Sequence, residues 1–307
     1  MSILCLGSVN TDLVIRCPRL PRPGETVLGG EFYQAQGGKG ANQAVAAARA
    51  IGKPGQVTFL GAVGSDEYGK GSRGALLKEG IECTHLKEVN SVPSGIAFIL
   101  VDECGENLIG VASGANGHLF PADIDALPPG IFASAKVFLA SLEVPLPTVE
   151  RGLARAKQQG LFTILNPAPI TDAAAVRKLL PLVDLLTPNE HELAALTQQS
   201  VDSVESATSA ARRLNLRVIV TLGSAGAVLV DADQTSHHIL AFPVTPVDTT
   251  AAGDCFSGAL AAALAEGDEL IAPARFASAA AALSVTRRGA QPSLPRREEI
   301  EALLRRG

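Results

Sequence analysis

Short apolar runs alternate with longer alanine-rich segments along most of this chain. Most runs lack a strict apolar–polar alternation, which is typical of strands buried on both faces. The predicted strands are Ile3–Val9, Val57–Val63, Lys136–Leu142, Leu161–Leu165, Val183–Thr187, Val218–Leu222 and Ala227–Val230. The predicted helices between them are Ala41–Ile51, Gly69–Glu79, Leu146–Gln159, Asp172–Leu180, Glu190–Leu196, Val204–Leu214, Phe256–Glu266 and Ala272–Val285. This alternation predicts an α/β fold with a mainly parallel central sheet, covered by helices on both faces.

Two stretches interrupt the alternation. The first contains several prolines and glycines around the strand-like pieces Leu13–Arg16 and Thr26–Gln34, and the second resembles a hairpin with a turn at Asp102–Glu106. Strands without partner helices do not fit a covered parallel sheet. We therefore assign residues 13–36 and 95–112 to a small β-sheet lid, and residues 1–12, 37–94 and 113–307 to the α/β domain. A lid with one bare face needs a covering surface, and a homodimer through two lids is the simplest solution.

Composition narrows the classes of partner. The chain has 307 residues, of which 47% are apolar, and a formal net charge of −5 at pH 7. Nucleic acid and anionic membrane surfaces need concentrated Lys and Arg, so we expect neither as a partner. The most apolar predicted helix, Phe256–Glu266, is too short to span a bilayer.

The cysteines favour a reducing compartment. There are five, an odd number, without a Cys-x-x-Cys pair. This pattern is typical of reduced thiols, not of a disulfide framework or a zinc site. The first residues also lack the basic segment of a secretory leader. We therefore expect a cytoplasmic protein.

A glycine-rich segment, Gly37–Asn42, precedes an alanine-rich helix. Three glycines in four positions allow a ligand to approach the backbone, and the first helix amides point outward. Lys39 and Asn42 are the polar side chains there. The spacing does not match a Walker A loop. An ordinary loop before a helix is the alternative interpretation.

A second segment of small residues, Asp248–Gly258, also leads into a helix. The amides of Ala251, Ala252, Gly253 and Asp254 are candidates for an anion hole at that helix N-terminus. Asp254 is a candidate base for an alcohol, and we expect the helix N-terminus to favour its ionised form. The alternative is that Asp254 serves only as an N-cap.

Two further polar pairs are candidates for binding. Asn10 and Asp12 follow the first predicted strand and face the same side of an extended chain, which suits a diol; a polar turn is the alternative. Asn189 and Glu192 share a helix face and can orient Mg²⁺-bound water and phosphate; a capping box is the alternative.

Two other patterns carry little weight. Gly69–Gly74 matches Gly-x-Gly-x-x-Gly, but the preceding strand ends too early for a dinucleotide-binding turn. His237 and His238 lack metal-ligand spacing and are expected on the surface or on an edge strand.

Taken in this order and at this spacing, the segments resemble the ribokinase family of carbohydrate kinases. The resemblance runs from Leu6 to Leu303 and depends on the ordered set, because no single motif decides it. Besides the two glycine-containing segments, it includes Leu142–Pro145, Asn166–Pro169, Thr221–Gly226 and Thr286–Ser293. It implies an α/β domain with a β lid that pairs in a dimer.

The resemblance also implies roles for individual residues. Those that resemble the sugar-binding set are Asn10, Asp12, Gly38, Lys39, Asn42, Glu143 and Asp254. Those that resemble the nucleotide-binding positions are Asn189, Thr221, Leu222, Gly223, Ser224, Ala225, Gly226, Gly253, Asp254 and Ser278. A monovalent-cation site for K⁺, built mostly from backbone carbonyls, is implied at Asp248, Thr250, Ser284, Arg287, Gly289 and Ser293, and Glu192 helps to place Mg²⁺ indirectly. Ala251 stands where many relatives have glycine, and Ser278 where some have histidine.

The implied reaction transfers the γ-phosphoryl group of ATP to the 5-hydroxyl of ribose. Asp254 is the implied base, and the amides of Ala251, Ala252 and Gly253 form the anion hole. A same-family kinase for deoxyribose, fructose or a nucleoside is the first alternative. A non-catalytic sugar-binding protein and a Rossmann oxidoreductase are less favoured.

Overall fold

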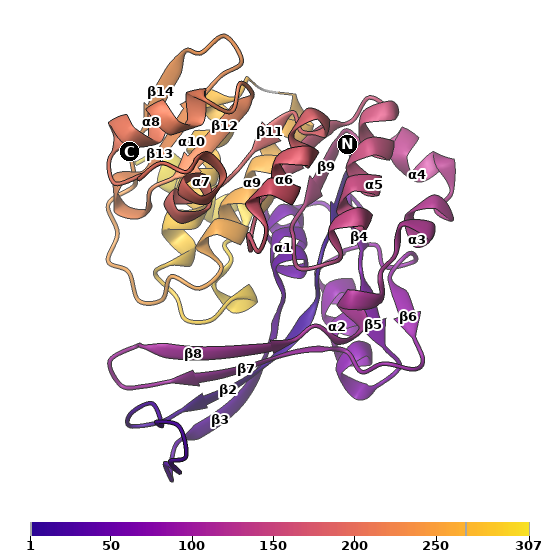
Figure 1. The fold of residues 1–307 in the computed structure, drawn as a ribbon, viewed down its shortest axis with the longest axis vertical. Helices are drawn as coiled ribbons and strands as arrows, with labels where there is room; N and C mark the ends of the chain where they lie inside the picture. The colour runs from indigo at the N-terminus through magenta and orange to yellow at the C-terminus, as the bar shows by residue number, and fades with distance from the viewer. Residues whose placement is uncertain (1, 268, 307) are drawn as a thin grey trace.

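The computed structural model describes residues 2–267 and 269–306. Its main feature is a sheet of eight strands in the order β14-β13-β12-β11-β10-β9-β1-β4 (Figure 1). The strands are β1 (Ile3–Leu6), β4 (Val57–Leu60), β9 (Val137–Ala140), β10 (Phe162–Leu165), β11 (Leu185–Leu186), β12 (Arg217–Thr221), β13 (Ala227–Val230) and β14 (Ser236–Ile239). Six of them, from β4 to β12, pair in parallel. Strand β13 is antiparallel to both of its neighbours, β12 and β14.

Helices cover both faces of this sheet. They are α1 (Lys39–Ile51), α2 (Glu67–Lys78), α3 (Pro121–Asp125), α4 (Pro129–Ser134), α5 (Leu146–Gln158), α6 (Ala173–Leu179), α7 (Glu190–Thr197), α8 (Val204–Arg212), α9 (Ala252–Glu266), α10 (Ile271–Ser284) and α11 (Arg297–Leu304). Strand β1 has a continuous apolar run because both of its faces are buried. Ile3 and Cys5 belong to one core cluster, and Leu4 and Leu6 belong to the other. The predicted fold class is confirmed.

A separate four-stranded sheet extends from one end of the large domain (Figure 1). Its order is β3-β2-β7-β8, with β2 (Asn10–Arg16), β3 (Glu31–Gly37), β7 (Gly95–Val101) and β8 (Asn107–Ala112). A third, two-stranded sheet pairs β5 (Ala62–Gly64) with β6 (Lys87–Val89). The predicted hairpin is therefore present as β7 and β8.

The sequence prediction was wrong about the start of β3. A strand was expected from Thr26, but it begins at Glu31, because Gly29 and Gly30 have φ values of 89° and 127° that break an extended strand. Glycine is required at position 30, since a Cβ there would lie 2.1 Å from the carbonyl oxygen of Arg16. Strand β2 begins at Asn10, and β3 continues to Gly37.

Other expectations have clear outcomes. The glycine pattern at Gly69–Gly74 lies inside α2, which confirms that it is no dinucleotide-binding turn. His237 and His238 are exposed on the edge strand β14, as expected. Within the described ranges, no helix has the length and apolar content needed to cross a membrane.

Candidate active site

The N-termini of α1 and α9 lie side by side at the carboxyl ends of the parallel strands, next to the base of the small sheet. Small residues allow the two helices to approach closely. A Cβ at Gly258 in α9 would lie 2.3 Å from the carbonyl oxygen of Gln43 in α1. The fold therefore brings together the two glycine-containing segments singled out in the sequence.

Asp254 lies in the first turn of α9 and is 6% exposed. Its Oδ2 accepts a hydrogen bond from Asn42 Nδ2 and its Oδ1 accepts one from Gln43 Nε2, both at 3.0 Å. The N-cap of α9 is Ala251, so Asp254 is not the N-cap. Its carboxylate is instead held by side chains of the neighbouring helix.

The expected protonation of Asp254 needs a correction. We expected the helix N-terminus to favour the ionised form, but burial raises the pKa of this carboxyl. Lys39 and the hydrogen bonds from Asn42 and Gln43 oppose that rise without cancelling it. Burial was not visible in the sequence, since it depends on how α1 and α9 pack.

Lys39 lies among three carboxylates. Burial acts to lower the pKa of its ammonium group, but Asp254, Glu143 and Glu192 outweigh burial, so the pKa is raised. Lys39 is therefore a fixed positive charge in a half-buried site, suited to an anionic ligand group.

Glu143 holds the glycine-rich segment in place. Its Oε2 accepts hydrogen bonds from Ser8 Oγ and, at 3.0 Å, from the backbone N–H of Lys39. Gly38, the N-cap of α1, has a φ of 89° and no side chain to cap the helix. Glu143 thus supplies the negative charge that stabilises this helix N-terminus.

Gly40 is expected to contribute strongly to stability. A Cβ at this position would lie 2.5 Å from Gly7 Cα and 2.7 Å from Ser8 N, both backbone atoms. Gly40→Ala is therefore expected to destabilise the protein by about 3 kcal/mol, the upper range for overpacking. Thermal unfolding measures the change. Gly74→Ala is the matched control, because a Cβ at Gly74 in α2 meets no atom within 4 Å. Equal melting temperatures for the two variants would contradict the prediction.

Asn10 and Asp12 lie in β2, so the polar-turn alternative is wrong and their side chains share a face. Asn10 Oδ1 accepts a hydrogen bond of 2.8 Å from Asn116 Nδ2, which fixes its orientation. Burial, and then Glu143, raise the pKa of Asp12 to about 7.

Asp12 is expected to make stability depend on pH. In the folded chain Asp12 keeps its proton up to about pH 7, whereas in the unfolded chain it releases the proton near pH 3.8, the ordinary pKa of an aspartate. Between these values the folded state binds more protons, so Asp12 lowers the free energy of unfolding as pH rises. Asp12→Asn removes this effect, and its stability relative to wild type is expected to increase by about 2 kcal/mol from pH 5 to pH 8. Denaturant unfolding at both pH values measures this, and a gap that does not widen would contradict it.

The anion-hole loop has an unusual backbone. Ala251 adopts a left-handed conformation, with φ of 60°, which costs about 1 kcal/mol in a residue with a side chain. The amide of Ala252 donates to Thr249 O at 3.2 Å. The amides of Ala251, Gly253 and Asp254 have no hydrogen-bond partner within residues 2–267 and 269–306. These three N–H groups are available to an anion.

The structure places Asn189 and Glu192 in a capping box at the start of α7, as the alternative interpretation stated. Asn189 Oδ1 accepts from Glu192 N at 2.8 Å, and Glu192 Oε2 accepts from Asn189 N at 2.9 Å. Burial raises the pKa of Glu192. Asn189 forms an isolated bridge with Thr221, which brings the loop from Leu222 to Gly226 to the same edge of the sheet.

The predicted cation-site residues come from two segments that meet at Asp248. Its Oδ1 accepts from Thr250 N at 2.9 Å and its Oδ2 from Gly289 N at 2.8 Å. Burial acts against ionisation of Asp248, but the hydrogen bonds and Arg16 outweigh burial, so its pKa is lowered. The guanidinium of Arg287 bonds Glu299.

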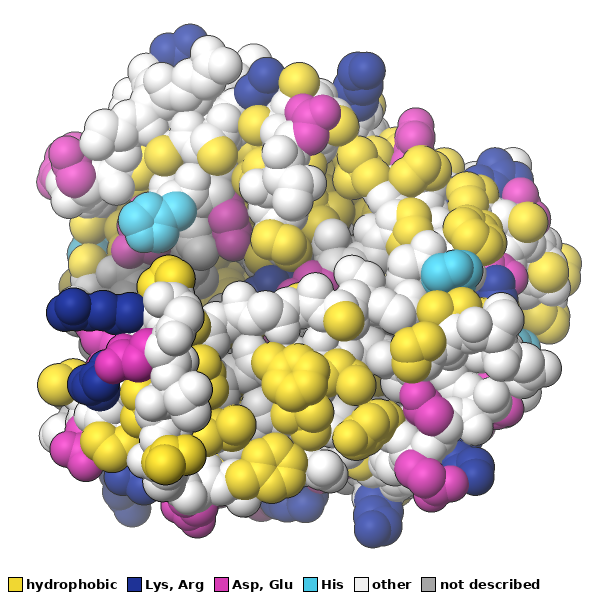
Figure 2. Space-filling model, turned by 60° about the horizontal axis from the view of Figure 1, so that its bottom comes forward, with side chains coloured by type: hydrophobic (Ala, Val, Ile, Leu, Met, Phe, Trp, Pro, Cys, Tyr) yellow, Lys and Arg dark blue, Asp and Glu magenta, His cyan; other side chains and the backbone are white. Residues whose placement is uncertain are grey.

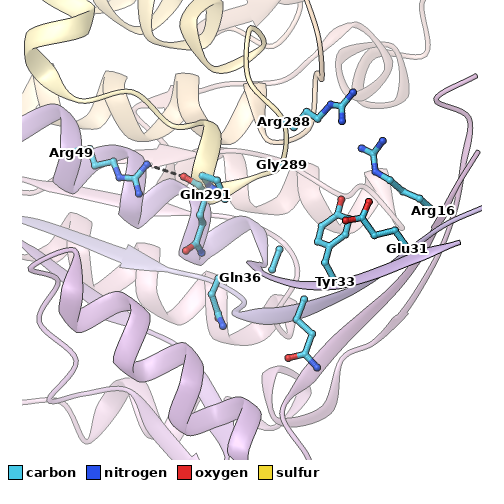
Figure 3. Close-up of a pocket in the computed structure, with 11 residues that line it drawn as sticks. Arg16, Glu31, Tyr33, Gln36, Arg49, Arg288, Gly289 and Gln291 are labelled. Carbon is cyan, nitrogen blue, oxygen red and sulfur yellow. Dashed lines mark hydrogen bonds between the residues drawn. The ribbon is translucent and has the colours of Figure 1, made fainter. Parts of the chain in front are cut away.

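A pocket lies beside these residues, and Asp254 does not line it. It has a volume of about 530 Å³ and opens between β3 and the segment 288–292. Figure 3 shows Arg16 and Glu31 extending toward it from the small sheet and Arg288 from the large domain. In the part of the chain that the structure describes, no group of three or more His, Cys, Asp or Glu residues could hold a metal ion.

Comparison with known proteins decides the family. A model of the pfkB family of carbohydrate kinases matches residues 1–297. The chain belongs to the pfkB family of carbohydrate kinases. It is 43% identical to the ribokinase of Haemophilus influenzae over 302 residues, covering 97% of this chain and 96% of that protein.

Solved structures of pfkB-type kinases agree with this assignment. The ribokinase of Giardia lamblia superposes with a TM-score of 0.91 at 31% identity, covering 99% of this chain and 98% of that one. An Arabidopsis thaliana ribokinase complexed with ribose and ATP superposes with a TM-score of 0.89 at 32% identity, with the same coverage. The family resemblance predicted from the sequence is confirmed.

Two polar residues of this site were not predicted from the sequence to have a role. Gln43 is 1% exposed and Asn166 is 6% exposed, and Gln43 Nε2 donates to Asn166 Oδ1 at 3.0 Å. Gln43 directly follows Asn42 and Asn166 begins one of the motifs, but nothing in their spacing shows that they meet. Ser278, predicted on the nucleotide side, is buried in α10.

Proposed function

We propose that this chain transfers the γ-phosphoryl group of ATP to the 5-hydroxyl of D-ribose, giving ribose 5-phosphate and ADP. The observation that carries this is the pairing of a buried carboxylate with unpartnered amides. Asp254 lies at the mouth of α9, and the amides of Gly253 and Asp254 have no partner in residues 2–267 and 269–306. A general base and an anion hole in one helix turn are what phosphoryl transfer to an alcohol requires.

An unsatisfied acceptor supports the sugar side of the proposal. Asn42 Oδ1 is buried without a hydrogen-bond partner, while its Nδ2 is bonded to Asp254. A buried acceptor left unpaired costs about 1–3 kcal/mol, so a hydroxyl donor from the sugar would remove that cost. Asn10, Asp12, Gly38, Lys39 and Glu143 complete the proposed sugar site.

The proposed mechanism depends mainly on alignment. The 5-hydroxyl lies beside Asp254, which accepts its proton as the oxygen bonds to the γ-phosphorus and the bond from that phosphorus to the bridging oxygen breaks, so that ADP leaves. The amides of Ala251 and Gly253 stabilise the charge on the transferred group, and Lys39 adds a fixed positive charge. The raised pKa of Asp254 makes it a stronger base than an exposed carboxylate.

Two metal ions are proposed as cofactors. Mg²⁺ neutralises phosphate charge when bound, and the carboxylate of Glu192, close enough to Lys39 and Asp254 to affect both, fits an indirect role through water. K⁺ fits the loop of Asp248, whose carboxylate accepts hydrogen bonds from the backbone of Thr250 and Gly289 and so holds the two segments together. Backbone oxygens of these segments are proposed as its main ligands, because the guanidinium of Arg287 is paired with Glu299. The proposed K⁺ ligands are residues 248, 250, 284, 287, 289 and 293.

The nucleotide is proposed to bind along the edge formed by Asn189 and the loop after β12. Gly223 has a φ of 54°, and a Cβ there would meet no atom within 4 Å, so the backbone is open to a ligand. The carbonyl of Ala225 accepts a hydrogen bond of 2.7 Å from His238. Thr221, Leu222, Ser224, Gly226, Gly253 and Ser278 complete the proposed site.

The small sheet is proposed to act as a lid and to pair with a second copy in a homodimer. Figure 2 shows apolar side chains gathered on this part of the molecule. The side chains of Phe32, Phe98 and Leu108 are each at least half exposed. Large apolar side chains gathered on an exposed sheet face are typical of a protein interface. Sedimentation at micromolar concentration tests this: a dimer is expected, and a monomer would contradict it.

A cytoplasmic location is also proposed, since all five cysteines are free.

The proposed reaction is tested by ADP release from Mg-ATP with ribose, 2-deoxyribose, fructose and adenosine in parallel, with and without K⁺. Ribose is expected to give the highest kcat/KM, and K⁺ to raise it. The reported relatives are named ribokinases, which favours ribose over the other acceptors. Turnover with another acceptor alone would overturn the choice of sugar. Ribose binding without turnover would indicate a sugar-binding protein.

A further inference from the structure

The side-chain amide of Gln43 is held in one orientation by its neighbours in the site. It lies in α1, is 1% exposed, and its Nε2 donates to two acceptors at 3.0 Å: Asp254 Oδ1 and Asn166 Oδ1. A side-chain amide nitrogen carries two protons, so both are used. The close packing of α1 on α9 at Gly258 sets the distance between Gln43 and Asp254.

The orientation of the Gln43 amide is determined by a chain of hydrogen bonds that begins at a backbone carbonyl. Thr187 O can only accept, and Asn166 Nδ2 donates to it at 2.8 Å. Asn166 therefore presents its Oδ1 to Gln43, which must answer with its Nε2. The second proton of that nitrogen is then directed at Asp254. Turning the amide over would place an oxygen against the carboxylate.

We propose that Gln43 is a positioning residue, which holds the Asp254 carboxylate in its reactive orientation. This rests on the proposed function, in which Asp254 is the base. Gln43 differs from Asn42, whose Oδ1 is left unpartnered for a ligand. Because Gln43 is buried behind the carboxylate, its loss acts on kcat and on the pH profile and not on ribose affinity.

Several charges also face Asp254 and determine the direction of the effect. Lys39 from α1 favours the ionised carboxylate, while Glu143 after β9 and Glu192 from α7 oppose it. Burial already raises the pKa of Asp254, and the hydrogen bond from Gln43 lowers it. Removing that donor leaves the opposing groups in place, so the acid limb of activity moves to higher pH.

The test compares pH profiles of kcat for wild type, Gln43→Met and Gln43→Glu with ribose and Mg-ATP. Gln43→Met keeps the shape and removes the donor, so the acid limb is expected about one pH unit higher. At pH 7, kcat is expected about 10- to 100-fold lower, partly recovered at higher pH, with KM for ribose changed less than about threefold. Gln43→Glu places an acceptor against Asp254 and is expected to shift the limb further.

The control and a second variant keep the test decisive. Thr148→Val removes a buried hydrogen bond to Leu119 O, of 2.6 Å, away from the site, and its acid limb is expected to match wild type. Gln43→Leu also removes the donor to Asp254 and is expected to shift the limb as Gln43→Met does, which serves if that variant does not fold. An unmoved limb in a folded Gln43→Met or Gln43→Leu protein, or a loss confined to KM, would overturn the role of Gln43. Absence of ribose-dependent turnover in wild type would instead overturn the proposed function.

Discussion

Replacement of Asp254 by asparagine is expected to lower ribose-dependent ADP formation by about 10²–10⁴-fold, the usual contribution of a general base. The amide has nearly the same shape as the carboxylate but cannot take the proton of the 5-hydroxyl. Asn42 and Gln43 donate to the two carboxylate oxygens at 3.0 Å, so the variant keeps an acceptor for Gln43, and Asn42 has to turn its side-chain amide to accept from the new NH2 group. Steady-state ADP release under saturating ribose measures the loss, and calorimetry with ribose alone measures whether the sugar still binds.

Asp172→Asn is the matched control for that substitution. Asp172 is the N-cap of α6, where asparagine serves equally well, and it is exposed. Its turnover is expected to equal that of wild type. An Asp254→Asn protein that keeps its fold and retains more than about a tenth of wild-type kcat would show that Asp254 is not the base, since proton acceptance contributes at least about 10²-fold.

Gly253→Ala is expected to lower kcat by about 10²–10³-fold without loss of stability. A Cβ at position 253 would meet no protein atom within 4 Å, and its backbone does not require glycine. Glycine in a helix costs about 0.5–1 kcal/mol relative to alanine, so the fold gives no reason for it. The reason we infer is the ligand: the methyl group would occupy the space where a phosphoryl oxygen meets the amides.

Gly130→Ala is a close control, because Gly130 is also the second residue of its helix and a Cβ there meets no atom within 4 Å. Both variants are expected to melt at or above the wild-type temperature, and only Gly253→Ala to lose activity. Full activity in Gly253→Ala would contradict the anion hole proposed at α9. Equal losses in both variants would show that the effect is not local.

The large sheet was predictable from the sequence because its strands are buried on both faces. Each predicted apolar run overlaps an observed strand, although β14 was not predicted. In β1, successive side chains are buried in the two different core clusters, which makes its apolar run continuous. Helices α3 and α4 were not predicted, since they span only five and six residues and each begins with a proline. So short an element shows no helical periodicity in its sequence.

The polar motifs were predictable as segments, but their contacts were not. Asp254 and Gln43 are separated by 211 positions along the chain, and Gln43 and Asn166 by 123. No spacing rule predicts that they share hydrogen bonds. The pKa of Asp254 was predicted in the wrong direction for the same reason: the helix N-terminus is visible in the sequence, whereas the burial that outweighs it arises from packing.

Identification of the product tests the central claim most directly. The chain is incubated with ribose labelled with ¹³C at carbon 5 and Mg-ATP, and the product is examined by ³¹P and ¹³C nuclear magnetic resonance. We predict a single new phosphate monoester whose phosphorus couples to the labelled carbon, together with an equal amount of ADP. A phosphoryl group on any other carbon, or ADP formed without a sugar phosphate, would contradict transfer to the 5-hydroxyl.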